Sequence, residues 1–131
     1  MIERNGAVMR QSVIKKNTSF AASLSGACRG IKYSLKTESH MRFHFFISLL
    51  VVISGFVFHL SGIQWLFVTY AISSVLVAEL FNTALERTVD LAKPNLDPLA
   101  GMAKDIAAGA VLITTIQAVI VGSVIFGSYI F

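Results

Sequence analysis

The chain has 131 residues, of which 55% are hydrophobic and 14% are charged, and its mean hydropathy is +0.72. A soluble domain carries about 25% charged residues, so this composition excludes an ordinary soluble protein and favours an integral membrane protein. The formal net charge is +4, and eight of the eleven Lys and Arg residues precede residue 43.

Residues 1–18 lead into the first regular pattern, and we expect a mobile N-terminus there. In residues 19–36 apolar side chains recur at spacings of three and four, which predicts an α-helix with one apolar face. These apolar residues are Phe20, Leu24, Ala27, Ile31 and Leu35, and basic residues occupy another face. Such a helix is typical of one lying in the lipid headgroup layer, although a plain topology anchor explains the basic residues equally well.

Three apolar segments follow, each close to the roughly 20 residues that cross a hydrocarbon core. They predict spans of about residues 43–60, 65–90 and 104–131, within one membrane domain of residues 19–131. The expected fold is therefore all-α: an integral membrane protein with an N-terminal amphipathic surface helix and three transmembrane helices.

Charge placement predicts the orientation of the spans. The link 61–64 and the C-terminal tail carry no charge, whereas residues 1–42 and the second link, 87–105, hold every Lys and Arg. By the positive-inside rule, the N-terminus and the second link are cytoplasmic. The charged groups would then face the compartment that contains nucleotides.

The second span carries a polar stripe along one face. Its members are Glu79, Asn82, Thr83, Glu86 and Asp90, which fall within roughly 60° of a common direction at about 100° per residue. Lipid does not solvate such a face, so the stripe must face protein, water or a ligand, and neighbouring copies would wall it off. Thr83 is expected to bond back to its own helix or to pack against a neighbour. Ionisable residues within a span mark a functional site.

The carboxylates lie at different depths, which predicts different roles. Glu79 is two turns, about 10 Å, deeper than Glu86, and Asp90 is about 6 Å further towards water. A carboxylate deep in a low-dielectric medium binds a proton more readily than one in water, which suits a general base for a lipid hydroxyl. At the surface, Glu86 and Glu38 would hold Mg²⁺ together with substrate phosphates.

Lys104 and Asp105 open the third predicted span, level with Glu86 and Asp90. In the first turn of a helix, Lys104 would offer a point charge and orphan backbone amides to a phosphate. The small residues 107–110 permit close helix packing. A base, a cation, a lysine and a helix dipole together suit phosphoryl transfer, in which catalysis is mainly positioning and charge stabilisation.

Two motifs carry a resemblance to a known family. The run ELFNTALERTVD (79–90) and, after thirteen intervening residues, KDIAAGAV (104–111) resemble the signature of the prokaryotic diacylglycerol kinase family, which includes the undecaprenol kinases of Gram-positive bacteria. The resemblance covers about residue 19 to the C-terminus. It implies an ATP- and Mg²⁺-dependent kinase of lipid alcohols in the bacterial cell membrane, built as a homotrimer with active sites formed between protomers. We expect no nucleic-acid partner.

Carried over by position, the resemblance implies a role for each polar residue. Glu79 corresponds to the catalytic base, with Asn82 beside it, and Arg42 to a basic position near the lipid substrate. Glu38 and Glu86 correspond to the metal-binding carboxylates. The nucleotide-contacting positions are Glu38, Glu86, Asp90, Lys104 and Asp105.

The chain departs from the family at two places. An arginine that is common early in the surface helix aligns with Ser19, and the usual His-Pro-Leu of the second cytoplasmic loop is Asp97-Pro98-Leu99. Pro98-Leu99, Thr37-Glu38 and His44 resemble the Gram-positive branch. Undecaprenol is therefore the favoured substrate, and diacylglycerol is the alternative.

Two other interpretations of the sequence are open. A small proton-coupled transporter would use Glu79 as a protonatable intramembrane group, but three spans are a thin scaffold for alternating access and Lys104 would have no role. His40 and His44, four residues apart, would ligate zinc only with further ligands, so plain interfacial histidines are the favoured interpretation.

Overall fold

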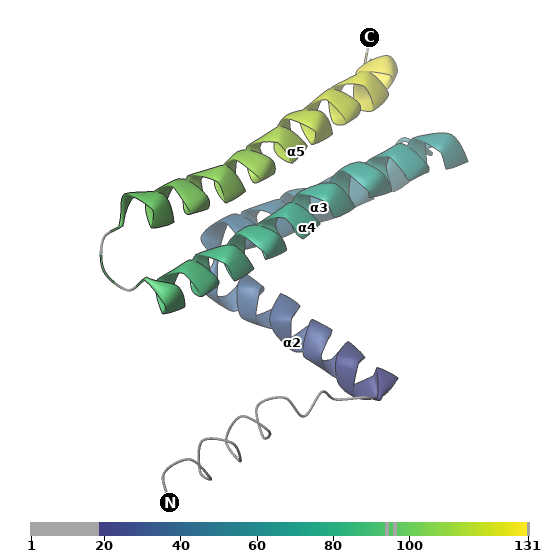
Figure 1. Cartoon of the computed structure of the whole chain (residues 1–131). Coiled ribbons are helices and arrows are strands. Elements are labelled where there is room, and N and C mark those ends of the chain that lie inside the picture. The colour runs from purple at the N-terminus through teal and green to yellow at the C-terminus, as the bar shows by residue number, and fades with distance from the viewer. Residues whose placement is uncertain (1–18, 94, 96, 131) are drawn as a thin grey trace, which may run out of the picture. The chain divides into compact units, whose positions relative to one another are not determined.

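The computed structural model describes residues 19–93, 95 and 97–130. Within these residues the chain forms four helices: α2 (Phe20–Thr37), α3 (Ser39–Val57), α4 (Gly62–Ala92) and α5 (Pro98–Ile130) (Figure 1). Helices α3, α4 and α5 are long and apolar enough to cross a membrane. The prediction of an all-α fold with three helices able to span a membrane is thereby confirmed. The predicted mobile N-terminus lies outside the described residues.

Helix α2 runs across the boundary between two units of the chain, which divide between Tyr33 and Ser34. Its start is capped, because the Ser19 hydroxyl accepts the backbone N–H of Ala22 at 3.1 Å. Phe20 and Leu24, which belong to the predicted apolar face, are exposed by 84% and 56%. Exposure of this face is what a helix on a lipid surface requires, and the surface placement itself stays a prediction.

Helices α3 and α4 form an antiparallel hairpin with a very short link. The Ser61 hydroxyl accepts the N–H of Gln64, and the Gln64 side chain accepts the N–H of Ser61, so a reciprocal cap starts α4. The helices approach closely at Gly55, where an added Cβ would lie 2.7 Å from the Trp65 ring. The register between the two helices is therefore fixed near the link.

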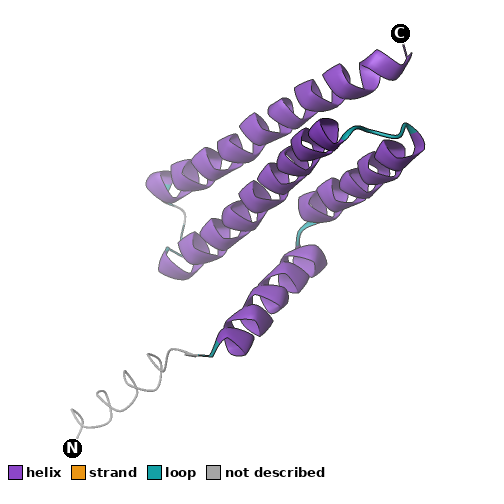
Figure 2. Cartoon of the chain, turned by 90° about the vertical axis from the view of Figure 1, so that its right-hand side faces the viewer, coloured by secondary structure: helices purple, strands orange, loops and turns teal. Residues whose placement is uncertain are grey.

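Helix α4 packs along both α3 and α5 (Figure 2). A small core forms near the α3–α4 link from Leu60, Val68 and Ile125. Most of the remaining apolar side chains on the three long helices are exposed; Phe81, for example, is 74% exposed. Lipid or further protein covers such surfaces in a membrane protein.

The expected start of the third span is wrong. Lys104 was expected in the first turn of the third span, but α5 begins at Pro98 and places Lys104 in its second turn. The Asp97 carboxylate accepts the N–H groups of Leu99 and Ala100 at 2.9 and 3.4 Å, and a proline suits the first helical position. Only the first four amides of a helix lack intrahelical partners, so Lys104 does not offer an orphan amide to a phosphate.

Candidate active site

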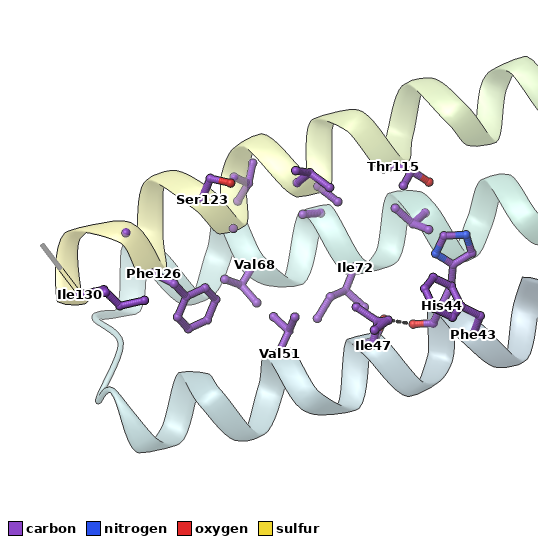
Figure 3. Close-up of a pocket in the computed structure, with 18 residues that line it drawn as sticks. Phe43, His44, Ile47, Val51, Val68, Ile72, Thr115, Ser123, Phe126 and Ile130 are labelled. Carbon is purple, nitrogen blue, oxygen red and sulfur yellow. Dashed lines mark hydrogen bonds between the residues drawn. The ribbon is translucent and has the colours of Figure 1, made fainter.

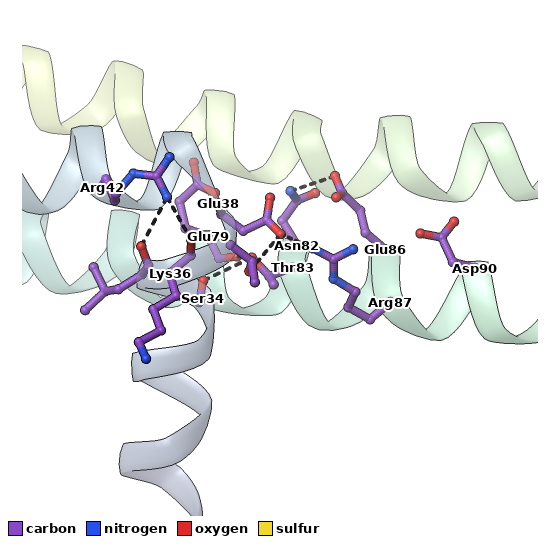
Figure 4. Close-up of polar contacts among 12 residues, drawn as sticks. Ser34, Lys36, Glu38, Arg42, Glu79, Asn82, Thr83, Glu86, Arg87 and Asp90 are labelled. Carbon is purple, nitrogen blue, oxygen red and sulfur yellow. Dashed lines mark hydrogen bonds and ion pairs between the residues drawn. The ribbon is translucent and has the colours of Figure 1, made fainter.

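The polar stripe of α4 is buried by protein at the Glu79 end and exposed at the Asp90 end. Glu79 and Thr83 are buried, with 3% and 5% exposure, while Asn82 and Glu86 are half-buried and Asp90 is exposed. Figure 4 shows these side chains along one side of α4, beside the start of α3. The stripe therefore has a sheltered carboxylate at one end and accessible carboxylates at the other.

Glu79 has a partner that sequence reasoning missed. The His44 Nε2 atom on α3 lies 3.3 Å from Glu79 Oε1, and the two side chains are 15% and 3% exposed. A buried carboxylate is costly unless it is paired or hydrogen-bonded, and this contact supplies that partner. A usable signal was present, because in a hairpin with a short link His44 and Glu79 lie at the same height to within about one helical turn.

Thr83 anchors the end of α2 to α4. The Thr83 hydroxyl donates to the Glu79 backbone carbonyl at 2.9 Å, which confirms the predicted back-bond. It also lies 3.2 Å from the Ser34 hydroxyl, which is 1% exposed. Since a hydroxyl has one proton and Thr83 gives its proton to Glu79, Ser34 is the donor in this contact. These two hydrogen bonds hold Ser34 against Thr83, which lies one helical turn from Glu79.

Glu38 and Arg42 hold the turn between α2 and α3. Glu38 forms an ion pair with Arg87 of α4 and accepts a hydrogen bond from the Thr37 hydroxyl at 3.2 Å. Arg42 donates to the backbone carbonyls of Leu35 and Lys36 at 3.3 and 3.1 Å. These are among the last carbonyls of α2, which lack helical partners and attract a cation. The guanidinium of Arg42 thus stabilises the turn between α2 and α3 in this structure.

Asn82 and Glu86 offer oxygen atoms in the half-buried part of the stripe. Asn82 donates through its side-chain nitrogen to Glu86 Oε1 at 3.1 Å. The other atom of this amide, Oδ1, is buried and has no hydrogen-bond partner within the described part of the chain. A buried acceptor without a partner costs about 1–3 kcal/mol, so this atom calls for a donor or a cation.

The Glu86 and Asn82 oxygen atoms are suitable ligands for a hard cation whose other ligands come from a substrate. Among the described residues, no three His, Cys, Asp or Glu side chains form a group that could hold a metal alone. Magnesium, however, is usually bound by one or two carboxylates together with substrate phosphates. The Glu86 carboxylate and the free Asn82 oxygen, with Glu38 at the neighbouring turn, are of the required chemistry.

Lys104 and Asp90 join α5 to α4 at the exposed end of the stripe. The Lys104 Nζ lies 2.5 Å from Asp90 Oδ1, and the two side chains are 36% and 52% exposed. Asp105, the next residue, is exposed. The expectation that Lys104 lies level with Asp90 is therefore met, although its helix begins earlier than expected.

Comparison with known proteins adds an independent finding. The family model for the prokaryotic diacylglycerol kinases matches residues 25–126, which include all the site residues described above. An undecaprenol kinase from Bacillus subtilis is 41% identical over 107 residues, which cover 82% of this chain and 87% of that protein. A diacylglycerol kinase from Synechocystis sp. is 36% identical over 115 residues, which cover 87% of this chain and 66% of that protein.

The Ser34–Thr83 contact gives a testable prediction. Thr83→Val keeps the shape of the side chain but leaves the buried Ser34 hydroxyl without its acceptor, so we expect a loss of about 1–3 kcal/mol in the free energy of unfolding. Adding Ser34→Ala to that variant should cost less than Ser34→Ala costs alone, because the stranded donor is then gone. Denaturant titration of the purified protein measures all four chains of this cycle. Additive losses would show that the two hydroxyls do not interact.

Proposed function

The chain belongs to the prokaryotic diacylglycerol kinase family and is a lipid kinase, and from this premise we propose that it phosphorylates undecaprenol to undecaprenyl phosphate. A kinase takes its phosphoryl group from ATP. The observation that carries the proposal is the buried Glu79 carboxylate, which His44 contacts inside a helix hairpin of membrane length. The family consists of enzymes, so the alternative class, a proton-coupled transporter, is not supported.

Glu79 is the proposed general base. It accepts the proton of the lipid hydroxyl as that oxygen bonds to the γ-phosphorus, while the bond to the bridging oxygen breaks and ADP leaves. His44 Nε2 lies 3.3 Å from Oε1 and would fix the carboxylate through this contact, which leaves Oε2 for the substrate hydroxyl. A base fixed within hydrogen-bond reach of the hydroxyl contributes by positioning, which is the main task in phosphoryl transfer.

The nucleotide end of the proposed site uses the less buried part of the stripe. Glu38 and Glu86 would hold Mg²⁺ together with the ATP phosphates, and Asn82 Oδ1 adds an oxygen beside Glu86. The cation would neutralise the charge of the phosphates. Asp90, Lys104 and Asp105 would contact the nucleotide, with Lys104 offering its ammonium group to a phosphate.

The membrane placement of the chain is part of the proposal. We place the protein in the bacterial cell membrane with its N-terminus and second link in the cytoplasm, because all Lys and Arg residues lie in those segments. The exposed apolar residues of α2 support a place in the headgroup layer, with Arg42 at the turn from which a lipid hydroxyl approaches. A homotrimer with composite sites is supported by the broad exposed apolar faces of the spans.

The lipid substrate is the first experimental question. The protein in nanodiscs, supplied with labelled ATP, Mg²⁺ and either undecaprenol or a diacylglycerol, should transfer label to undecaprenol at the higher kcat/KM. The relative with 41% identity supports this preference, and the relative with 36% identity supports the alternative. Faster labelling of the diacylglycerol would replace the proposed substrate by that alternative. If neither lipid is labelled, the proposed function is wrong.

The depths of the carboxylates predict different kinetic defects. Glu79→Gln removes the base but keeps the size and burial of the side chain, so kcat should fall by about 10²–10⁴-fold while the Kd for Mg²⁺–ATP stays near that of the wild type. Glu86→Gln should weaken Mg²⁺–ATP binding as well as turnover. Turnover assays combined with nucleotide titration distinguish the two. Equal losses of nucleotide binding in both variants would contradict the assigned roles.

A further inference from the structure

Arg87 has no role in the function proposed above, although it lies beside the polar stripe of α4. It follows Glu86 directly in the sequence, and its guanidinium forms an ion pair with Glu38 at the start of α3. The two side chains are 45% and 23% exposed, so solutes reach both. Figure 4 shows the Arg87 side chain extending from α4 towards Glu38. A positive charge therefore lies on one of the two carboxylates proposed to hold the cation.

Glu38 is bound to Arg87 and not to its own helix. It occupies the N-cap position of α3, where a side-chain oxygen often accepts a backbone N–H of the first turn, but its side chain makes no such bond. The hydrogen bonds from Arg87 and from the Thr37 hydroxyl instead both end on Oε1. An oxygen of a carboxylate has about two lone pairs, so a cation that binds Oε1 must displace one of these donors.

Arg87 also opposes a cation at the other oxygen of Glu38. Two positive charges on one carboxylate repel each other, and the guanidinium stays charged at every physiological pH. Partly exposed ion pairs hold their partners together by a factor of about two to five. Arg87 and the cation therefore compete for Glu38, whichever oxygen the cation uses.

The phosphates of ATP offer Arg87 another partner. The cavity at His44, between α3, α4 and α5, is lined mostly by apolar side chains, and its lining includes no Lys or Arg (Figure 3). Phosphates with several negative charges are too costly to bury there, so they belong at the exposed part of the stripe, where Glu86 lies. Arg87 is the next residue of α4, and a guanidinium matches phosphate oxygens with two parallel hydrogen bonds.

We propose that Arg87 is a further ATP-binding residue that exchanges one partner for another. Its guanidinium pairs with Glu38 until Mg²⁺–ATP binds, and then moves to the phosphates while the cation takes its place on the carboxylate. The exchange keeps Glu38 paired throughout and withholds it from a cation that arrives without nucleotide. The inference rests on the proposed function and adds a residue to its nucleotide end.

Two binding measurements on the full chain, in nanodiscs of zwitterionic lipid, distinguish this exchange from a structural role. Mn²⁺ substitutes for Mg²⁺ and is titrated alone by electron paramagnetic resonance, and Mg²⁺–ATP is titrated by calorimetry. We expect Arg87→Gln to lower the Kd for Mn²⁺ about two- to fivefold, because the competitor is gone. The same variant should raise the Kd for Mg²⁺–ATP about tenfold, because a charged contact with phosphate is lost.

Three further variants serve as controls. Arg29→Gln removes the same charge from a side chain that donates to Ser25 of its own helix, and both Kd values should stay near those of the wild type. Combining Glu38→Gln with Arg87→Gln should abolish the gain in Mn²⁺ binding, because the released carboxylate is then absent. Arg87→Lys keeps the charge but not the planar fork, so it should leave the Kd for Mn²⁺ unchanged and raise that for Mg²⁺–ATP.

Three results would overturn the inference. Weaker Mn²⁺ binding in Arg87→Gln would show that the ion pair only holds Glu38 in place. An unchanged Kd for Mg²⁺–ATP in both Arg87 variants would show that the guanidinium does not reach the phosphates. A gain in Mn²⁺ binding that persists in the double variant would show that Arg87 does not compete for Glu38. A wild-type protein that does not bind Mg²⁺–ATP would instead refute the proposed function.

Discussion

A carboxylate buried in a membrane span needs a partner, and the contact between His44 and Glu79 meets that need. Glu79 is 3% exposed, and burying a carboxylate to that extent without a partner costs several kcal/mol. The contact exists because α3 folds back on α4 through a link of four residues, 58–61, and because Gly55 lets Trp65 approach. The hairpin and the buried acid thus depend on one another.

The polar groups outside that contact are arranged by depth. Close to Glu79, hydroxyls from α2 and α4 bond to each other and to the backbone; further along, Glu38 pairs with Arg87 and Asp90 with Lys104. These ion pairs are partly exposed, so each contributes little to stability. They do hold charged groups at fixed heights along α4, and fixed charges are what phosphoryl transfer requires of a protein. A buried carboxylate and accessible charges therefore share one helix face.

Much of this arrangement could be predicted from single segments of sequence. Hydrophobic length correctly predicted the three helices that can span a membrane. The spacing of the polar residues from Glu79 to Asp90 correctly placed these residues on one side of α4. Contacts between segments were harder to predict, because they depend on the register of two helices. The partner of Glu79 was missed for that reason. The ion pair of Glu38 with Arg87 also joins distant segments.

The start of α5 was missed for a different reason. Asp97-Pro98 falls within the predicted second link, 87–105, although an aspartate before a proline is a good helix start. The departure from the usual His-Pro-Leu therefore has a structural consequence, since the Asp97 side chain caps α5. The earlier start moves Lys104 away from the helix terminus, and Asp90 holds its ammonium group.

The account depends most on the claim that His44 fixes Glu79 for proton transfer. The most direct measurement is kcat for His44→Leu and His44→Gln at saturating ATP and lipid. Leucine removes the donor, so kcat should fall by roughly 10–100-fold with little change in the KM for ATP, whereas glutamine keeps a donor near the Nε2 position and should restore most of the rate. Wild-type kcat in both variants would contradict the account.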